Sequence, residues 1–309
     1  MSALRAAAEG YVGMRRALGF KFATQGLLVW RLVDYLEARG ACRLTTALAV
    51  AWATEPAGAD PAWWAQRLSV ARGFARYLHN LDSTTEVPPP GLLSARFRRA
   101  TPYLCSAADV EALMAATAVL RHPLRRATYR ALIGLLAVSG MRVGEAIRLD
   151  RGDVDWDNGL VTVHASKFGR SREVPLHPSS LDALGDYAGE RDRLQGQPHA
   201  ASFFVSHVRA RLVYCSVCHT FRRLVDVAGL PAAPGTGRLP RLHDLRHGFC
   251  VQTLLDWYRA GADVETLIPA LSTYVGHTKP VWTYWYLEAA PELMAIAAGR
   301  LERAFEVTP

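Results

Sequence analysis

A proline-rich break divides the chain into two parts. Residues 84–104, TTEVPPPGLLSARFRRATPYL, hold three consecutive prolines and then a glycine. Proline lacks a backbone N–H and fixes its own φ, so a run of prolines ends the helix or strand before it. The length of 309 residues also exceeds the roughly 250 residues at which a single core usually stops growing. We therefore predict two domains, at 1–86 and 105–309, joined by a basic linker at 87–104.

The first part has the apolar spacing of helices. Apolar side chains recur every three or four residues over 27–36 and again over 63–78, which is the period of an amphipathic helix. The second run follows Asp60-Pro61, a pair typical of a helix start. We expect residues 1–86 to form an all-helical bundle.

The second part is predicted to be mostly helical, with one small antiparallel sheet. From Asp153 the apolar period changes to two, and Asn158-Gly159 lies between the runs VDW and LVTVH. Asn-Gly between apolar runs is a strong hairpin signal, and REVPL supplies a third strand. The fold class is therefore mainly α with a small antiparallel β-sheet (α+β). The apolar run 132–138 is expected to belong to a helix that ends at Ser139-Gly140. Further helices are expected at 106–117, 143–149, 178–194, 214–229, 244–258, 264–271, 281–287 and 291–305.

Positive charge is concentrated in the first part. Residues 1–100 carry 13 basic and 7 acidic side chains, whereas residues 101–309 carry 23 and 21. A basic domain joined to a nearly neutral one favours a polyanionic partner: nucleic acid first, an anionic membrane surface second, with a merely arginine-rich enzyme as the alternative. No run approaches the about 18 uncharged apolar residues of a membrane span, and the N-terminus lacks the pattern of a signal peptide. We expect a cytoplasmic protein with no membrane partner.

Five cysteines suggest neither disulfides nor a cofactor. An odd number in a chain without a signal peptide favours reduced thiols. CSVCH at 215–219 matches the C-x-x-C-H pattern of haem attachment, but it lies in a helical pattern and no second Cys/His pair has a zinc-ligand spacing. We expect buried helix cysteines, no metal and no haem.

Four separated segments hold side chains suited to phosphate chemistry. They are SGMRVGEAIRL with Arg142, SKFGRSREVPL with Lys167, RLHDLRHGF with His243 and Arg246, and YVGHTKPVWTYWYLEAAPEL with His277 and Tyr286. In this order, with a tyrosine nine residues after a glycine–histidine pair, they resemble the phage-integrase family of tyrosine recombinases. The resemblance covers about 105–300 with all six motif positions filled, and the helical first part resembles the family's core-binding (SAM-like) DNA-binding domain.

The two arginines suit a scissile phosphate. Their planar donor forks match phosphate oxygens and keep their charge. Arg246 lies three residues after His243, so both side chains fall on one helix face. Taken alone, Arg246 could be an ordinary helix arginine paired with an aspartate. Glu145, one turn after Arg142, is expected to orient an arginine and not to act as a catalytic acid.

Tyr286 is the predicted nucleophile. A phenol has a pKa of about 10, so attack on phosphorus needs proton removal and a positive field. His243 or His277 could take the proton, and the sequence leaves this open. Tyr284 could compete, or either tyrosine could simply pack in the core, but the spacing favours Tyr286. The resemblance implies a 3′-phosphotyrosine intermediate and a free 5′-hydroxyl, with no cofactor, metal or ATP.

Lys167 is the predicted general acid. The chain has 33 arginines and only three lysines, yet it keeps a lysine at the tip of the predicted hairpin. A lysine can give a proton to the leaving 5′-oxygen, whereas an arginine cannot usefully do so. The alternative is a solvent-exposed turn lysine.

Further basic residues are expected to contact the DNA backbone, where contacts carry no sequence information. The predicted DNA-binding residues are Arg96, Arg98, Arg99, Arg170 and Arg172.

One spacing departs from the family pattern. The spacing from Arg246 to His277 is 31 residues, longer than the family implies, and we attribute the excess to an enlarged connection between helices.

The resemblance also implies partners. It implies a protein that is monomeric or weakly oligomeric when free, assembles as a homotetramer on two double-stranded DNA sites, and is nucleoid-associated in a bacterium, with accessory proteins possible. The predicted tail helix at 291–309 would dock on a neighbour or on its own domain. Two other functions stay open: a type IB-like topoisomerase, and a catalytically silent DNA-binding regulator with the same fold.

Overall fold

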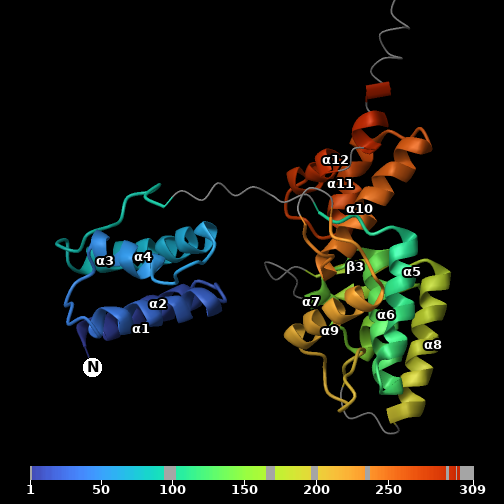
Figure 1. The fold of residues 1–309 in the computed structure, drawn as a ribbon, viewed down its shortest axis with the longest axis horizontal. Coiled ribbons are helices and arrows are strands. Elements are labelled where there is room, and N and C mark those ends of the chain that lie inside the picture. The colour runs from blue at the N-terminus through green and yellow to red at the C-terminus, as the bar shows by residue number, and fades with distance from the viewer. Residues whose placement is uncertain are drawn as a thin grey trace, which may run out of the picture. The chain divides into compact units, whose positions relative to one another are not determined.

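The fold is described from a computed structural model covering residues 2–93, 102–164, 171–195, 201–233, 237–289, 292–296 and 298–299. The chain forms two compact units, Met1–Arg99 and Ala100–Pro309, coloured blue to cyan and green to red in Figure 1. The first unit contains α1 (Ala3–Ala17), α2 (Ala23–Glu37), α3 (Thr46–Thr54) and α4 (Pro61–Leu81). The second contains α5 (Ala107–Ala116), η1 (Thr117–Val119), α6 (Pro123–Ser139), α7 (Val143–Ala146), η2 (Arg151–Asp153), β1 (Val154–Asp155), β2 (Leu160–Val163), β3 (Arg172–Pro175), α8 (Pro178–Gln195), α9 (Tyr214–Val227), α10 (Leu242–Arg259), α11 (Val264–Tyr274) and α12 (Val281–Ala289).

The first unit is a bundle of four helices around its own apolar core. The helix predicted after Asp60-Pro61 begins at Pro61, where the Asp60 carboxylate accepts the N–H of Ala62 at 2.8 Å. Trp52 and Phe74 are among its fully buried side chains. Val87 and Leu93, in the segment expected to be linker, pack against this core.

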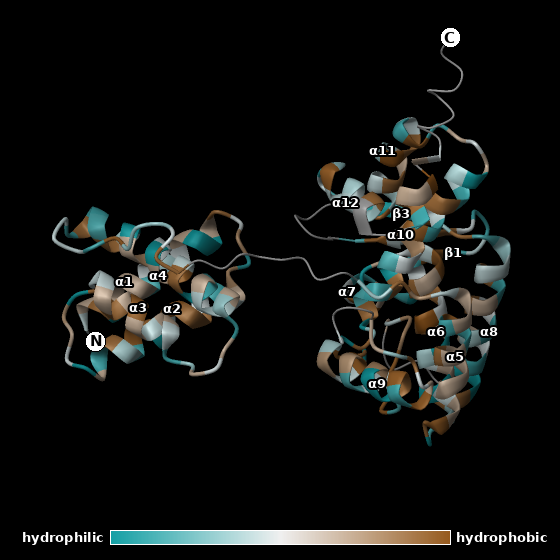
Figure 2. Cartoon of the chain, turned by 45° about the horizontal axis from the view of Figure 1, so that its top comes forward, coloured by the Kyte–Doolittle hydropathy of each residue, from teal (hydrophilic) through white to brown (hydrophobic). Residues whose placement is uncertain are grey.

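The second unit is built around α6. This helix packs against α5, α8 and α10, and Figure 2 shows brown, apolar segments beside teal ones along these helices. It ends at Gly140, which has a φ of +56°, a left-handed conformation that favours glycine. A Cβ at Gly140 would lie 2.5 Å from Cδ1 of Phe249, so the turn after α6 lies directly against α10.

The predicted sheet is present with the predicted connectivity. Its strand order is β1-β2-β3, all antiparallel, and Gly159 in the first turn has a φ of +69°. Val161 of β2 faces Val174 of β3, and both are buried in the main core of the unit. The prediction of a mainly α fold with a small antiparallel sheet is confirmed.

A second, smaller core lies between α10, α11 and α12. It contains Leu254, Ile268 and Tyr286. The long spacing between Arg246 and His277 is taken up here by helix, because α10 continues to Arg259 and α11 covers Val264–Tyr274. The predicted enlarged connection is therefore wrong, since only residues 260–263 separate the two helices.

The cysteines differ in part from expectation. Cys215 and Cys218 lie on α9 as predicted, but Cys215 is exposed and Cys218 is only half-buried. The prediction of buried helix cysteines is thus wrong for this pair, because the polar face of α9 carries Cys215. Among the described residues, no cluster of His, Cys, Asp and Glu could hold a metal. No helix in the described part of the chain has the length and apolarity needed to cross a membrane.

Candidate active site

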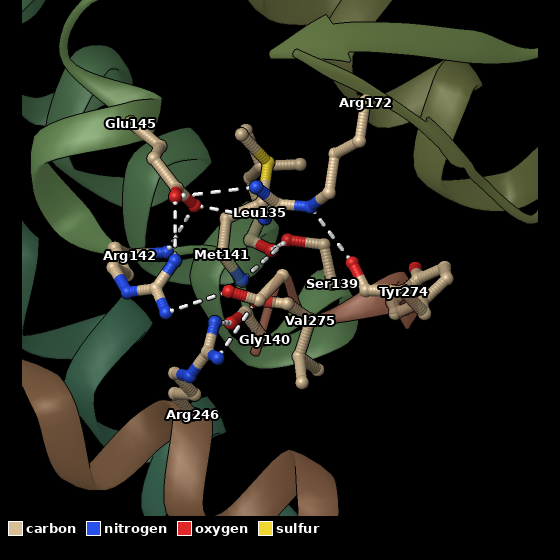
Figure 3. Close-up of polar contacts among 11 residues, drawn as sticks. Leu135, Ser139, Gly140, Met141, Arg142, Glu145, Arg172, Arg246, Tyr274 and Val275 are labelled. Carbon is tan, nitrogen blue, oxygen red and sulfur yellow. Dashed lines mark hydrogen bonds and ion pairs between the residues drawn. The ribbon is translucent and has the colours of Figure 1, made fainter. Parts of the chain in front are cut away.

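Arg142 is held at the start of α7 by a carboxylate and a backbone carbonyl. Its backbone N–H and its Nη1 donate to the Glu145 carboxylate at 3.0 and 2.8 Å, and its Nη2 donates to the Gly276 carbonyl at 3.0 Å. The arrangement closes the first turn of α7, with Glu145 three residues into the helix, as in a capping box. These bonds hold the guanidinium between the first turn of α7 and the turn at Gly276 (Figure 3).

Arg246 is anchored by two backbone carbonyls. Its Nη1 donates to Gly140 and its Nη2 to Val275, both at 2.7 Å. The side chain is 1% exposed. Burial, and then the charge of Arg142, lowers its pKa, but an arginine stays protonated in proteins. Figure 3 shows both arginines pointing toward the same pair of turns.

The turn after α11 brings these carbonyls together. The helix α11 ends at Tyr274, Val275 is its C-cap, and Gly276 follows with a φ of +70°. The N–H of His277 then donates to the carbonyl of Ser272 at 2.8 Å, so the chain reverses as at many helix C-termini. One turn therefore places His277 and provides the acceptors for Arg142 and Arg246.

Arg172 of β3 joins the same network. Its Nη1 and Nη2 donate to the two Glu145 oxygens at 3.2 and 2.8 Å, and its Nε donates to the Tyr274 carbonyl at 2.8 Å. Its side chain is 11% exposed. The structure thus places Arg172 inward on protein acceptors, whereas the sequence predicted a contact with DNA.

Glu145 is a carboxylate shared by two arginines in the protein interior. Its burial is the largest influence on its pKa and acts to raise it. The hydrogen bonds and charges of Arg172 and Arg142 together outweigh burial and lower the pKa to about 2. Glu145 is therefore ionised at neutral pH and acts as the counter-ion of both arginines.

Both predicted histidines lie beside the arginines. Burial, and then the charges of Arg246 and Arg142, lowers the pKa of His277 to about 3, and its Nδ1 lies 2.8 Å from the Thr283 hydroxyl. Partial burial and the same two arginines also lower the pKa of His243, although this side chain reaches solvent. In the free protein both rings are neutral near pH 7, so each has a ring nitrogen that can accept a proton.

Tyr286, on α12, lies next to His277 and Arg246. Its ring stacks against His277 with the centroids 6.0 Å apart and the planes 16° apart, and it is 2% exposed. Burial, and then Cys250, raises the pKa of its hydroxyl, whereas Arg246 acts in the opposite direction. Tyr284 differs, since it is 43% exposed.

The structure adds two neighbours that the motifs did not indicate. Cys250, one turn after Arg246 on α10, is fully buried and lies within hydrogen-bonding reach of the Tyr286 hydroxyl. The ring of His247 lies 5.5 Å from that of Tyr286. The helical spacing of these residues from Arg246 and His243 was visible in the sequence, but their contact with α12 was not.

Other predicted residues fall outside the described part of the chain. The structure brings together five of the six motif residues, namely Arg142, His243, Arg246, His277 and Tyr286. The predicted residues that lie outside the described part of the chain are Lys167, Arg170, Arg96, Arg98 and Arg99, together with much of the predicted tail helix.

The site can bind an anion and deliver a hydroxyl to it. Each guanidinium has five N–H donors, of which Arg142 uses two and Arg246 two on the protein acceptors described above. The remaining donors and the two positive charges suit a phosphate group. A buried phenol and two neutral imidazoles stand next to them.

Comparison with known proteins agrees with this arrangement. The phage integrase family model matches residues 105–292, the whole span from α5 into the segment after α12. The chain belongs to the phage integrase family. Its members are tyrosine recombinases, so this protein is a DNA-binding recombinase of the integrase type, and the resemblance found in the sequence is confirmed.

Individual integrases cover nearly the whole chain. The protein y4rB of Sinorhizobium fredii (strain NBRC 101917 / NGR234), named as an integrase/recombinase, is 44% identical over 313 residues, which is 99% of each chain. The solved structure of XerH site-specific recombinase bound to palindromic difH substrate has a TM-score of 0.65 at 18% identity, covering 95% of this chain and 81% of XerH. A lambda integrase tetramer bound to a Holliday junction has a TM-score of 0.62 at 19% identity, covering 90% and 78%. These likenesses to solved structures concern the fold.

Proposed function

We propose that this integrase is a site-specific recombinase that cleaves and rejoins DNA through a 3′-phosphotyrosine intermediate, with Tyr286 as the nucleophile. The observation that carries the proposal is the position of Tyr286, stacked on His277 and beside Arg246 although the three residues come from different elements. Tyr284, the rival in the sequence, lies at the surface instead. A phenol beside a cation is suited to attack a phosphodiester.

Arg142 and Arg246 would bind the scissile phosphate. Attack on phosphorus adds negative charge to the phosphate oxygens, and fixed cations at that position stabilise it without reorganisation. Both guanidinium groups are held by carbonyls of the turns at Gly140, Val275 and Gly276. This anchoring supports a role as a preorganised phosphate clamp.

Proton transfer would use the histidines and Lys167. His277 and His243 have lowered pKa values, so both rings are neutral in the free protein, and a phosphate bound at Arg142 and Arg246 would offset the two positive charges that make the rings weak bases. We assign Lys167 as the general acid for the leaving 5′-oxygen, on the sequence argument alone. The phosphodiester bond energy is kept in the phosphotyrosine, so the scheme needs no ATP. The two guanidinium groups would supply the positive charge that a metal ion could otherwise provide.

The partner would be double-stranded DNA. The titles of related structures describe XerH on its difH substrate and a lambda integrase tetramer on a Holliday junction. By analogy we propose that four copies of this chain act on two DNA sites. Residues 1–86 would be the core-binding domain, 87–104 the basic linker with Arg96, Arg98 and Arg99, and 105–309 the catalytic domain of a cytoplasmic protein.

A covalent-capture experiment tests the nucleophile. The protein is incubated with a nicked suicide duplex carrying a site verified by footprinting, and protein–DNA adducts are separated by denaturing electrophoresis. Wild type and the matched control Tyr284→Phe should form the adduct, and Tyr286→Phe should not. Absence of any wild-type adduct at a bound site would refute the proposal, whereas an adduct with Tyr286→Phe would refute only the assignment of the nucleophile.

A leaving-group experiment tests Lys167. Lys167→Arg should bind the DNA normally and lose most cleavage of the ordinary substrate, because arginine is a poor proton donor. A 5′-bridging phosphorothiolate leaves without a proton, so cleavage of that substrate should largely recover. An equal loss on both substrates would exclude Lys167 as the general acid.

A further inference from the structure

The side chain of Arg172 points into the protein and not outward, as a contact with DNA would require. It follows the predicted hairpin tip, where an arginine would ordinarily face solvent or phosphate. Instead its three donor nitrogens are all bound to protein acceptors: two donate to Glu145 and one to the Tyr274 carbonyl. The bidentate geometry to a carboxylate is the strongest form of this interaction.

The contacts of Arg172 tie together three elements that carry active-site residues. Through Glu145 it reaches α7 and Arg142. Through the Tyr274 carbonyl it reaches the end of α11, three residues before His277. The Tyr274 hydroxyl donates back to the Pro175 carbonyl of β3 at 3.2 Å, so the strand and the end of α11 are joined at two points.

Gly276 makes room for this arrangement. A Cβ at that position would lie 2.8 Å from Nη1 of Arg172. The guanidinium therefore packs directly on the turn whose carbonyl receives Arg142. The close approach means that Arg172 fixes the position of the turn as well as that of the carboxylate.

We propose that Arg172 is a positioning residue for DNA cleavage, acting through Glu145 on Arg142 and through the Tyr274 carbonyl on the turn that carries His277. It does not touch the DNA. The inference rests on the proposed function, since it assigns Arg142 to the scissile phosphate. Its effect is on the rate of cleavage, because misplacing a charged group by about 1 Å can cost 100-fold.

The charges around Glu145 give the proposal a pH signature. The groups facing this carboxylate are Arg142 at the start of α7, Arg172 on β3 and, farther away, Arg246 on α10. His277, in the turn after α11, senses the same arginines. Removing Arg172 leaves Glu145 buried with one direct partner, so its pKa rises. Glu145 then takes up a proton at a higher pH than in wild type and releases Arg142.

The experiment compares Arg172→Lys and Arg172→Ala with a matched control, Arg191→Lys. Arg191 is also buried, donates two bonds to a carboxylate, Asp192, and one to a carbonyl, Phe203. Single-turnover cleavage of the suicide duplex is measured at saturating DNA, with affinity measured separately at several salt concentrations. We expect cleavage to slow by about 10- to 100-fold in both Arg172 variants, while Arg191→Lys stays within about twofold of wild type.

Two further readouts separate positioning from a purely structural role. Cleavage by Arg172→Ala should fall on acidification at a higher pH than cleavage by wild type. Arg172→Lys should slow cleavage by a smaller factor in the Glu145→Gln background than in wild type, because residues acting through one another are not additive, and the part that remains is the action through the Tyr274 carbonyl. Circular dichroism of each variant identifies any that fails to fold, and Arg172→Lys is the variant most able to keep the fold.

Three results would overturn the inference. A slope of log affinity against log salt that falls by about 1 in Arg172→Ala would make the residue a phosphate contact. An equal slowing by Arg191→Lys would make the effect one of general stability, and full additivity with Glu145→Gln would exclude action through that carboxylate. Each of these is read in a protein whose wild type forms the adduct, so loss of the wild-type adduct, which refutes the proposed function, is a separate result.

Discussion

Two carboxylates of the second unit are each held by two arginines, and they differ in where they lie. Glu145 binds Arg142 and Arg172 in the interior, with its side chain 2% exposed. Asp192, on α8, binds Arg151 and Arg191 with its side chain 44% exposed. Both carboxyl groups have a pKa lowered to about 2.

The influences that lower the pKa to about 2 differ between the two carboxyl groups. For Asp192 the largest influence is the hydrogen bond from Arg191, and burial is secondary. For Glu145 the largest influence is burial, which acts to raise the pKa and is overcome only by both arginines together. The ion pairs of Asp192 are therefore a local feature of the surface, whereas at Glu145 the charged form of the carboxylate depends on its arginines. Loss of a charged partner should lower the free energy of unfolding far more at Glu145 than at Asp192.

Removal of each carboxylate should give the largest contrast. Glu145→Ala leaves Arg142 and Arg172 without their counter-ion in the interior and should lower the free energy of unfolding by about 3–5 kcal/mol. Asp192→Ala should cost less, about 1–2 kcal/mol, because water reaches the place of the lost carboxylate and the buried Arg191 keeps its bond to the Phe203 carbonyl. Urea denaturation followed by tryptophan fluorescence measures both, and equal costs would remove the distinction.

A methyl group at Gly276 should disturb the interior site alone. Gly276→Ala must adopt a left-handed backbone and displace Arg172, for a combined cost of about 2–4 kcal/mol. The control is Gly261→Ala, at a φ of +73° with open space around it, which should cost about 1–2 kcal/mol from the backbone alone. Thermal unfolding compares the two, and a control that costs as much as Gly276→Ala would mean that contact with Arg172 is unimportant.

Acidification should unfold the protein partly through Glu145. Its pKa is lowered from 4.5 to about 2 on folding, so its contribution is complete above about pH 4.5 and is lost as the pH falls through about 2. The contribution is on the order of 3 kcal/mol. Glu145→Gln should flatten the dependence of unfolding free energy on pH in this window. Asp192→Asn should change it less, and the reverse order would contradict the assignment of Glu145 as the buried member.

The smallest effect is expected at the surface pair. Arg151→Lys replaces a bidentate contact with Asp192 at 2.7 and 2.9 Å by a single one, in a pair that water reaches. It should change the free energy of unfolding by less than about 1 kcal/mol and leave cleavage unaltered. Denaturation and the adduct assay measure both quantities, and a marked loss of cleavage would extend the active-site network to α8.

The sequence predicted the fold through local signals. The hairpin followed from Asn158-Gly159 between alternating apolar runs, and that turn and its register are present. Helix positions followed from apolar spacing and from Asp60-Pro61. The helix that contains the run 132–138 ends at Ser139 before Gly140, as predicted, but its start at Pro123 was not predicted, because its first two turns are polar and arginine-rich.

The contacts of the site could be predicted only in part. Arg142, His243, Arg246, His277 and Tyr286 were chosen by order and spacing, and the structure brings them together. The inward position of Arg172 could not be predicted, since its acceptors lie 27 and 102 residues away in the chain. From the sequence alone, an arginine in a hairpin beside a predicted DNA site is expected to be exposed. Only the three-dimensional structure shows that its partner is the Glu145 carboxylate.

The acceptors of Arg142 and Arg246 have a consequence for tolerance to mutation. The carbonyls of Gly140, Val275 and Gly276 belong to the main chain, and no substitution can delete them. Gly140 and Gly276 accept no side chain without strain, because both have a positive φ and a close neighbour. The path of the backbone therefore fixes these acceptors, and among the side chains described above it is the Glu145 carboxylate on which Arg142 also depends.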